Sequence, residues 1–166
     1  MCSNRPQVRA LAAASFVLSL ESMIQIATAA PPTDACALLS QSQVAAALGV
    51  EVDAGEHVLG TLACRWTERG KSPGSDVARL QIALATARSF EIGKTPIPQW
   101  SKTPVTGIGD DAYIVEKGKV TFPVDPTLSV KRGSAFFTIS ALIPKGSMEQ
   151  TKALERTVAL KIVEKL

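Results

Sequence analysis

Hydrophobic and polar residues alternate in several short stretches of this 166-residue chain, and this pattern predicts β-strands. Leu62, Cys64 and Trp66 alternate with Ala63 and Arg65, so we expect the three to share the inward face of a strand. The same alternation, bounded by turn residues, predicts further strands over 79–84, 112–116, 119–124, 128–131 and 135–143.

Two amphipathic stretches that flank the predicted strands indicate helices. The first begins at Ser40 and ends at Gly49, and the second begins after Ser147. A Gln stands three residues after each Ser, which is the spacing of a capping box. The second helix carries apolar residues at a spacing of four, namely Leu154, Val158, Ile162 and Leu166. We therefore predict an α+β fold, an antiparallel sheet of about five to seven strands with an N-terminal and a C-terminal helix packed on it.

Residues 86–106 give the weakest structural signal. Phe90 is compatible with a short helix, but the prolines at 96, 98 and 104 exclude a long one. Trp100 lies among these prolines. Burial under the sheet is the favoured interpretation of Trp100, and the alternative is an exposed side chain that contacts a partner.

The N-terminus has the pattern of an export signal. Arg5 and Arg9 precede an apolar run over 10–20, which is too short to span a bilayer. Small residues at 27 and 29 then predict cleavage after Ala29, with cleavage after Ala30 as the alternative. We expect a signal peptide over 1–29, a single domain over 30–166, and an exported, periplasmic or secreted protein without a stable membrane span after cleavage.

Composition limits the chemistry. The 18 Lys and Arg against 15 Asp and Glu give a net charge of +3, too small and too scattered to predict nucleic-acid binding. After cleavage two cysteines remain, and in an exported protein they predict a disulfide between Cys36 and Cys64, with two buried thiols as the alternative. Zinc would need two further ligands, and His57 is the only His in the sequence, so we expect no metal site.

The sequence offers no catalytic triad, phosphate loop or cofactor motif, and we expect neither catalytic nor cofactor-binding residues. The segment 107–111 is predicted to be a tight turn before a strand. We predict a non-enzymatic protein that binds an unknown envelope protein or a small ligand. The alternative is a hydrolase-type envelope enzyme that uses carboxylates near Asp110, Asp111 and Glu116, although Asp110 and Asp111 are adjacent and should point to opposite faces of an extended chain.

Several stretches, in their order and spacing, resemble one family. Residues 34–40 and 44–49 are similar to its acidic–Cys–Leu–Leu opening and its Ala–Leu–Gly segment, 64–66 to its Cys–x–Trp strand, and 105–113 to its Gly–x–Gly–Asp–x–Ala–Tyr segment. This is a domain-of-unknown-function family of small bacterial envelope lipoproteins and secreted proteins. The resemblance implies a paired-cysteine α+β domain outside the cytoplasm, loosely similar to PsbP-like folds, with no established activity. The chain lacks the lipobox of many members.

Overall fold

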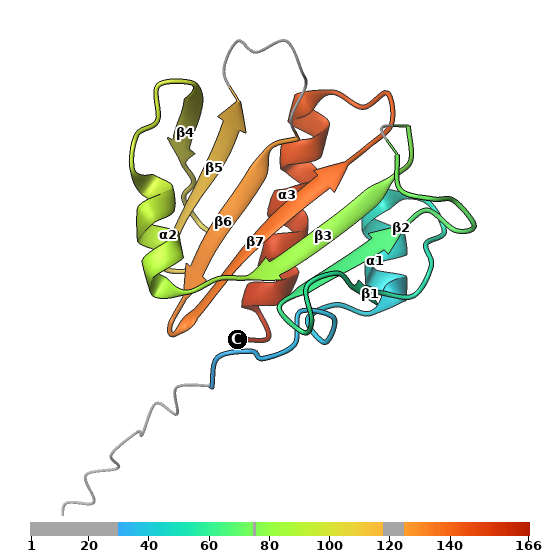
Figure 1. The fold of residues 1–166 in the computed structure, drawn as a ribbon, viewed down its shortest axis with the longest axis horizontal. Helices are drawn as coiled ribbons and strands as arrows, with labels where there is room; N and C mark the ends of the chain where they lie inside the picture. The colour runs from blue at the N-terminus through green and yellow to red at the C-terminus, as the bar shows by residue number, and fades with distance from the viewer. Residues whose placement is uncertain (1–29, 75, 118–124) are drawn as a thin grey trace, which may run out of the picture.

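The strands form one antiparallel sheet that is packed against helices (Figure 1). The structure is a computed structural model, and it describes residues 30–74, 76–117 and 125–166. The predicted signal peptide and the predicted strand 119–124 lie outside these residues. The elements are β1 (Glu56–His57), β2 (Ala63–Thr67), β3 (Arg79–Leu84), β4 (Trp100–Pro104), β5 (Asp111–Lys117), β6 (Thr127–Arg132), β7 (Ala135–Leu142), α1 (Gln41–Leu48), α2 (Ala87–Lys94) and α3 (Met148–Val163).

The strand order is β1-β2-β3-β7-β6-β5-β4, and every neighbouring pair is antiparallel. The first three strands form a meander from one edge, and the last four form a second meander from the other edge. The two meanders join at the centre, where β3 pairs with β7 from Arg79 opposite Leu142 to Leu84 opposite Phe137. The predicted α+β class, with helices from both ends of the chain on an antiparallel sheet, is confirmed.

The helix boundaries follow from capping chemistry. Ser40 and Ser147 each accept a hydrogen bond from the backbone N–H three residues on, and the Gln at that position accepts one from the Ser N–H in return. Both predicted capping boxes are thus present. Gly49 ends α1 with a φ of 71°, a left-handed conformation that costs a side-chain-bearing residue energy.

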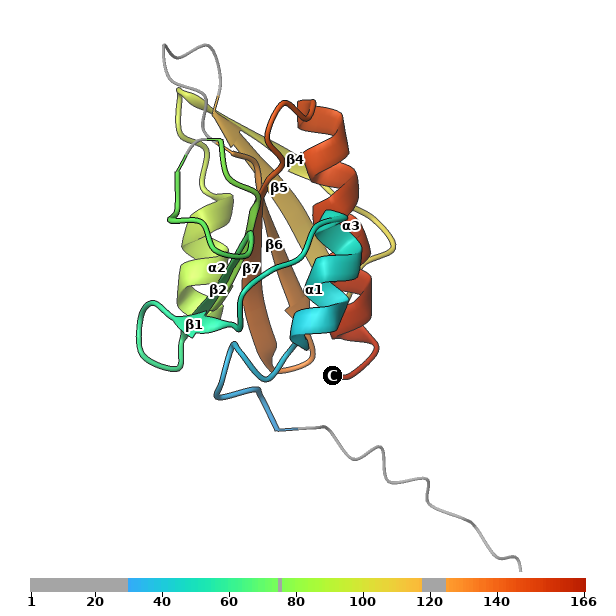
Figure 2. The same cartoon turned by 90° about the vertical axis from the view of Figure 1, so that its right-hand side faces the viewer.

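The hydrophobic core lies between one face of the sheet and the pair α1 and α3. Figure 2 shows α1 and α3 side by side on this face and α2 on the opposite side. Alternate strand residues point into the core, where Trp66, Phe137, Leu80, Ile82 and Ile139 are at most 1% exposed. Val158 and Ile162 of α3 close the core from the helix side and are fully buried.

Two predictions about the strands were wrong. Leu62 is 52% exposed and precedes β2, so only Cys64 and Trp66 of the predicted inward trio are buried. The region 86–106 contains, besides the predicted short helix around Phe90, an edge strand β4 that ends at Pro104. An edge strand tolerates a proline such as Pro104 because one of its sides needs no hydrogen bonds, so the proline pattern of this region did not exclude a strand.

α2 packs on the far face of the sheet through aromatic residues. The Phe90 ring lies 5.2 Å from the Tyr113 ring and 5.5 Å from the Phe136 ring, centroid to centroid. The Tyr113 hydroxyl donates a 3.0 Å hydrogen bond to the Phe90 carbonyl, and Gly93 leaves the room that this hydroxyl occupies.

None of the helices in the described part of the chain has the length and the hydrophobicity of a membrane span.

Candidate functional site

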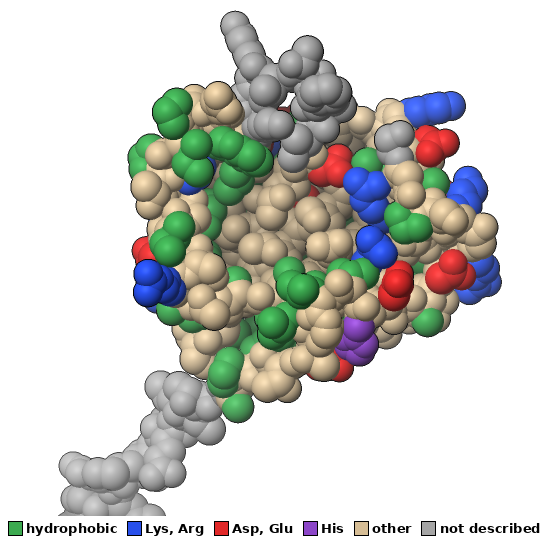
Figure 3. Space-filling view, viewed as in Figure 1, with side chains coloured by type: hydrophobic (Ala, Val, Ile, Leu, Met, Phe, Trp, Pro, Cys, Tyr) green, Lys and Arg blue, Asp and Glu red, His purple; other side chains and the backbone are tan. Residues whose placement is uncertain are grey.

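Among the described residues, the sheet face opposite α1 and α3 is covered by α2 only at one end, where Tyr113 and Phe136 lie. The rest of this face carries mostly polar side chains at consecutive register positions of β2, β3, β7 and β6. We call it the open face and define it by Arg65, Gln81, Thr127, Ser129, Thr138 and Ser140. Figure 3 shows this surface as a broad area of polar side chains and backbone, with charged side chains beside β2 and β3 and hydrophobic ones near β4.

The register places these residues in two adjacent rows. Arg65, Gln81, Ser140 and Thr127 are successive cross-strand partners from β2 to β6. Thr138 and Ser129 are partners in the next row. Ser129 is buried, and the other five residues of the open face are half-buried. Hydroxyl and amide groups in such rows both donate and accept hydrogen bonds, and together with the Arg65 guanidinium they suit a polar contact surface.

Arg65 marks one end of the open face. Its Nη2 donates to Glu56 Oε2 at 3.3 Å, whereas its buried Nε–H has no hydrogen-bond partner among the described residues. A buried donor without a partner costs about 1–3 kcal/mol. The half-buried Arg65 side chain therefore contributes a charged group to this face, while its buried Nε–H stays out of reach of a bound molecule.

Trp100 lies at the other side of the sheet, and its placement corrects the favoured interpretation from the sequence. It is not buried under the sheet, but begins edge strand β4 and is half-buried. The alternative, a contact with a partner, stays a prediction. Its N–H donates to the Ile97 carbonyl at 2.9 Å, and the Ile97 side chain is 49% exposed. The two side chains give the β4 edge an apolar character, as a partner contact would require.

The three carboxylates considered for catalysis do not converge. Asp110 accepts from Arg132 Nη1 at 3.2 Å and from the Gly133 N–H at 2.6 Å, and this backbone hydrogen bond, together with the guanidinium, lowers the pKa of Asp110. Asp111 forms an ion pair with Lys94 of α2, and Glu116 forms one with Lys152 of α3. α2 and α3 lie on opposite faces of the sheet, so Asp111 and Glu116 face away from each other (Figure 2).

The predicted disulfide between Cys36 and Cys64 is present, with Cα atoms 4.9 Å apart. It links the turn before α1 to the inward face of β2 and so clamps the start of α1 to the sheet. Asp34 accepts a 2.8 Å hydrogen bond from the Cys36 N–H and fixes that turn. The turn does not continue as a helix, because the helical residues begin at Gln41.

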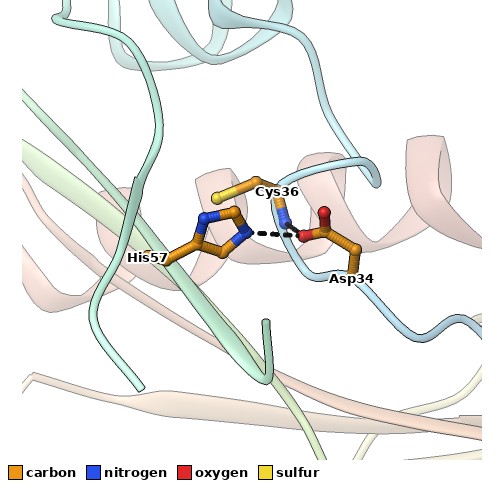
Figure 4. Close-up of side chains that lie close together, drawn as sticks. All are labelled: Asp34, Cys36 and His57. Carbon is orange, nitrogen blue, oxygen red and sulfur yellow. Dashed lines mark hydrogen bonds and ion pairs between the residues drawn. The ribbon is translucent and has the colours of Figure 1, made fainter. Parts of the chain in front are cut away.

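His57 lies beside this disulfide, a neighbour that the sequence did not predict. It stands directly opposite Cys64 in the β1–β2 register, and its Nε2 donates to Asp34 Oδ1 at 2.9 Å (Figure 4). The His57 hydrogen bond, and after it the one from Cys36, lower the pKa of Asp34. One donor atom each from Asp34, Cys36 and His57 lies within 4.8 Å of the other two. In the oxidised protein the sulfur of Cys36 is bonded to Cys64 and is no thiolate ligand.

Glu155 of α3 is a second group that the sequence analysis missed. It is fully buried, and its Oε1 accepts a 3.0 Å hydrogen bond from the Ala141 N–H, while its Oε2 has no partner among the described residues. Burial raises the pKa of Glu155 to about 9. Glu155 lies four residues from Thr151 and four from Ala159, both of which are buried on the same side of α3. This spacing is the feature of the sequence from which its burial could have been predicted.

Comparison of the chain with protein-family models, curated proteins and solved structures finds no match. The family resemblance therefore stays a prediction. The disulfide is typical of an oxidising compartment outside the cytoplasm.

Proposed function

We propose that this chain is an exported protein of the cell envelope, cleaved near Ala29, that binds a partner protein through the open face. The observation that carries the proposal is a sheet with one face covered by α1 and α3 and the other left with rows of small polar side chains. A small polar ligand is the second occupant that this surface would suit.

Three features support a protein partner. The open face extends over several strands and is broad, which suits a macromolecular contact. Arg65 is half-buried at one side, and Arg is enriched among residues that dominate interface energies. Trp100 and the exposed Ile97 add apolar area at the other side.

The test is site-specific photocrosslinking in intact cell envelopes. A photoreactive side chain replaces Ser140 at the centre of the open face or, as the matched control, Ala153 on the exposed side of α3. We expect a discrete crosslinked protein from position 140 and none from 153. Thr138→Arg, which adds bulk to the open face, should abolish the product, and Thr157→Arg on α3 should not.

Equal crosslinking from positions 140 and 153 would overturn the proposal. If position 140 captures no protein, but envelope metabolites raise the unfolding midpoint of the wild type and not of Thr138→Arg, the occupant is a small ligand.

A further inference from the structure

The residues around the disulfide contain a set of metal-binding donors that its oxidised state conceals. Asp34, Cys36 and His57 each bring one donor atom within 4.8 Å of the others, and Cys64 is covalently joined to Cys36. The set thus has two sulfurs, one imidazole nitrogen and one carboxylate oxygen. We propose that reduction of the disulfide converts this cluster into a four-ligand site for Zn²⁺ or a similar divalent transition metal.

The chemistry of the donors fits zinc. Zn²⁺ in structural sites is bound tetrahedrally by thiolates, imidazoles and carboxylates, at about 2.0–2.3 Å from each donor atom. Donor atoms of such a site are about 3.3–3.8 Å apart. For Asp34, Cys36 and His57 the 4.8 Å limit means that the donor atoms need to approach one another by about 1.5 Å or less. The Cys36 and Cys64 sulfurs, which are bonded in the oxidised protein, need to move apart by roughly 2 Å after reduction. His57 and Asp34 are 43% and 39% exposed at the side chain and have room for that adjustment.

The backbone holds the ligands in place independently of the disulfide. Cys64 and His57 are fixed opposite each other by the β1–β2 pairing. The Ala35 N–H donates to the Thr61 carbonyl at 2.8 Å, and this hydrogen bond ties the turn that carries Asp34 and Cys36 to the segment before β2. A bound metal would therefore join the same two segments that the disulfide joins.

Reduction of the disulfide has to precede metal binding. A dithiol reductant delivers two electrons and two protons, the Cys36–Cys64 bond breaks into two thiols, and the reductant becomes a cyclic disulfide. Binding of Zn²⁺ then displaces a proton from each thiol. Oxidation and metal binding compete for the same sulfurs, so the two states are mutually exclusive.

Cobalt is the probe, because Co²⁺ takes the same ligands as Zn²⁺ and is coloured. The reduced wild-type protein is titrated with Co²⁺ without oxygen. We expect one equivalent to give a thiolate-to-cobalt charge-transfer band and tetrahedral d–d bands, which Zn²⁺ abolishes by displacement. The oxidised protein should give neither band.

Variants assign the ligands. His57→Gln and Asp34→Asn should each weaken Co²⁺ binding about tenfold or more, since even residues that only orient metal ligands contribute that much. Glu56→Gln is the matched control, because Glu56 neighbours His57 in β1 but contacts Arg65. Cys64→Ser leaves Asp34, Cys36 and His57 without a disulfide and should bind Co²⁺ without reductant, with a weaker charge-transfer band.

A second readout covers the stability of the reduced protein. Zn²⁺ should raise the unfolding midpoint of the reduced wild type, and not that of the oxidised form. The proposal is overturned if the reduced wild type gives no tetrahedral spectrum, if Zn²⁺ leaves its midpoint unchanged, or if His57→Gln and Asp34→Asn bind Co²⁺ as tightly as the wild type. These outcomes do not involve the open face and leave the proposed function untouched.

Discussion

Replacement of Glu155 by Gln tests how a carboxyl group in the hydrophobic core depends on pH. Burial raises the pKa of Glu155 from 4.5 to about 9, so the folded protein holds a proton on this group at neutral pH. In the unfolded chain the same group ionises above pH 4.5. The folded state therefore binds one more proton than the unfolded state between these two pH values, and its stability falls as pH rises through that window.

The expected slope follows from proton linkage. Because the folded state holds one extra proton, the free energy of unfolding falls by about 1.4 kcal/mol for each unit that the pH rises. Between pH 4.5 and pH 7 the fall amounts to about 3 kcal/mol. The amide side chain of the Glu155→Gln variant would keep the hydrogen bond from Ala141 and would not titrate. Its NH₂ group would add a buried donor that costs about 1–3 kcal/mol at every pH. The pH dependence of the free energy of unfolding therefore tests the reasoning, whereas a constant difference between the two proteins does not.

The assay is urea unfolding from pH 5 to pH 9 with the disulfide intact, followed by the fluorescence of the buried Trp66. The free energy of unfolding of Glu155→Gln minus that of the wild type should rise steadily with pH. Glu164→Gln, which changes an exposed carboxylate at the end of the same helix, should follow the wild type. Parallel profiles for the wild type and Glu155→Gln would refute the reasoning, because they would mean that Glu155 ionises equally in both states.

Three further changes test the packing. Replacing both Cys36 and Cys64 by Ser should lower the free energy of unfolding by roughly 2–5 kcal/mol in chemical denaturation, and an unchanged midpoint would show that the clamp contributes nothing. Gly93→Ala sets a methyl group inside van der Waals contact of the Tyr113 hydroxyl and should cost about 1–3 kcal/mol, a loss that the added change Tyr113→Phe should partly reverse. Ser147→Ala removes the α3 cap and should cost about 1 kcal/mol, whereas Ser147→Asp should retain most of the stability in the same assay.

The sequence predicted those features of the fold that depend on residues close together in the chain. The capping boxes at Ser40 and Ser147 depend on residues three positions apart, and alternation in β7 reports directly which side chains enter the core. Leu62 was misplaced because the alternation of residue types extends one residue beyond the start of β2, to a side chain that lies outside the core. β4 was missed because Pro104 within it, and the two prolines before it, are compatible with an edge strand as well as with a loop.

The site was less predictable, because it depends on contacts between distant segments. The Cys36–Cys64 bond followed from cysteine number and compartment. The hydrogen bond from His57 to Asp34 exists only because the β1–β2 hairpin returns beside the turn before α1, and no spacing in the sequence records this. The open face likewise required the register of β7 between β3 and β6, which turns scattered Ser and Thr residues into adjacent rows.

The central pairing of β3 with β7 has a consequence for how the chain acquires its structure. Strands β1 to β3 leave the ribosome first, yet the inner edge of β3 stays without its neighbour until Ala135–Leu142 has been synthesised, and α3 comes later still. Such distant pairing delays folding, because the intervening segment must be ordered before the contact is made. The N-terminal half therefore has no complete core of its own, and the chain reaches its native state only when nearly all of it is available. For the export that we propose this delay is favourable, because a polypeptide must be unfolded to pass through a narrow translocation channel.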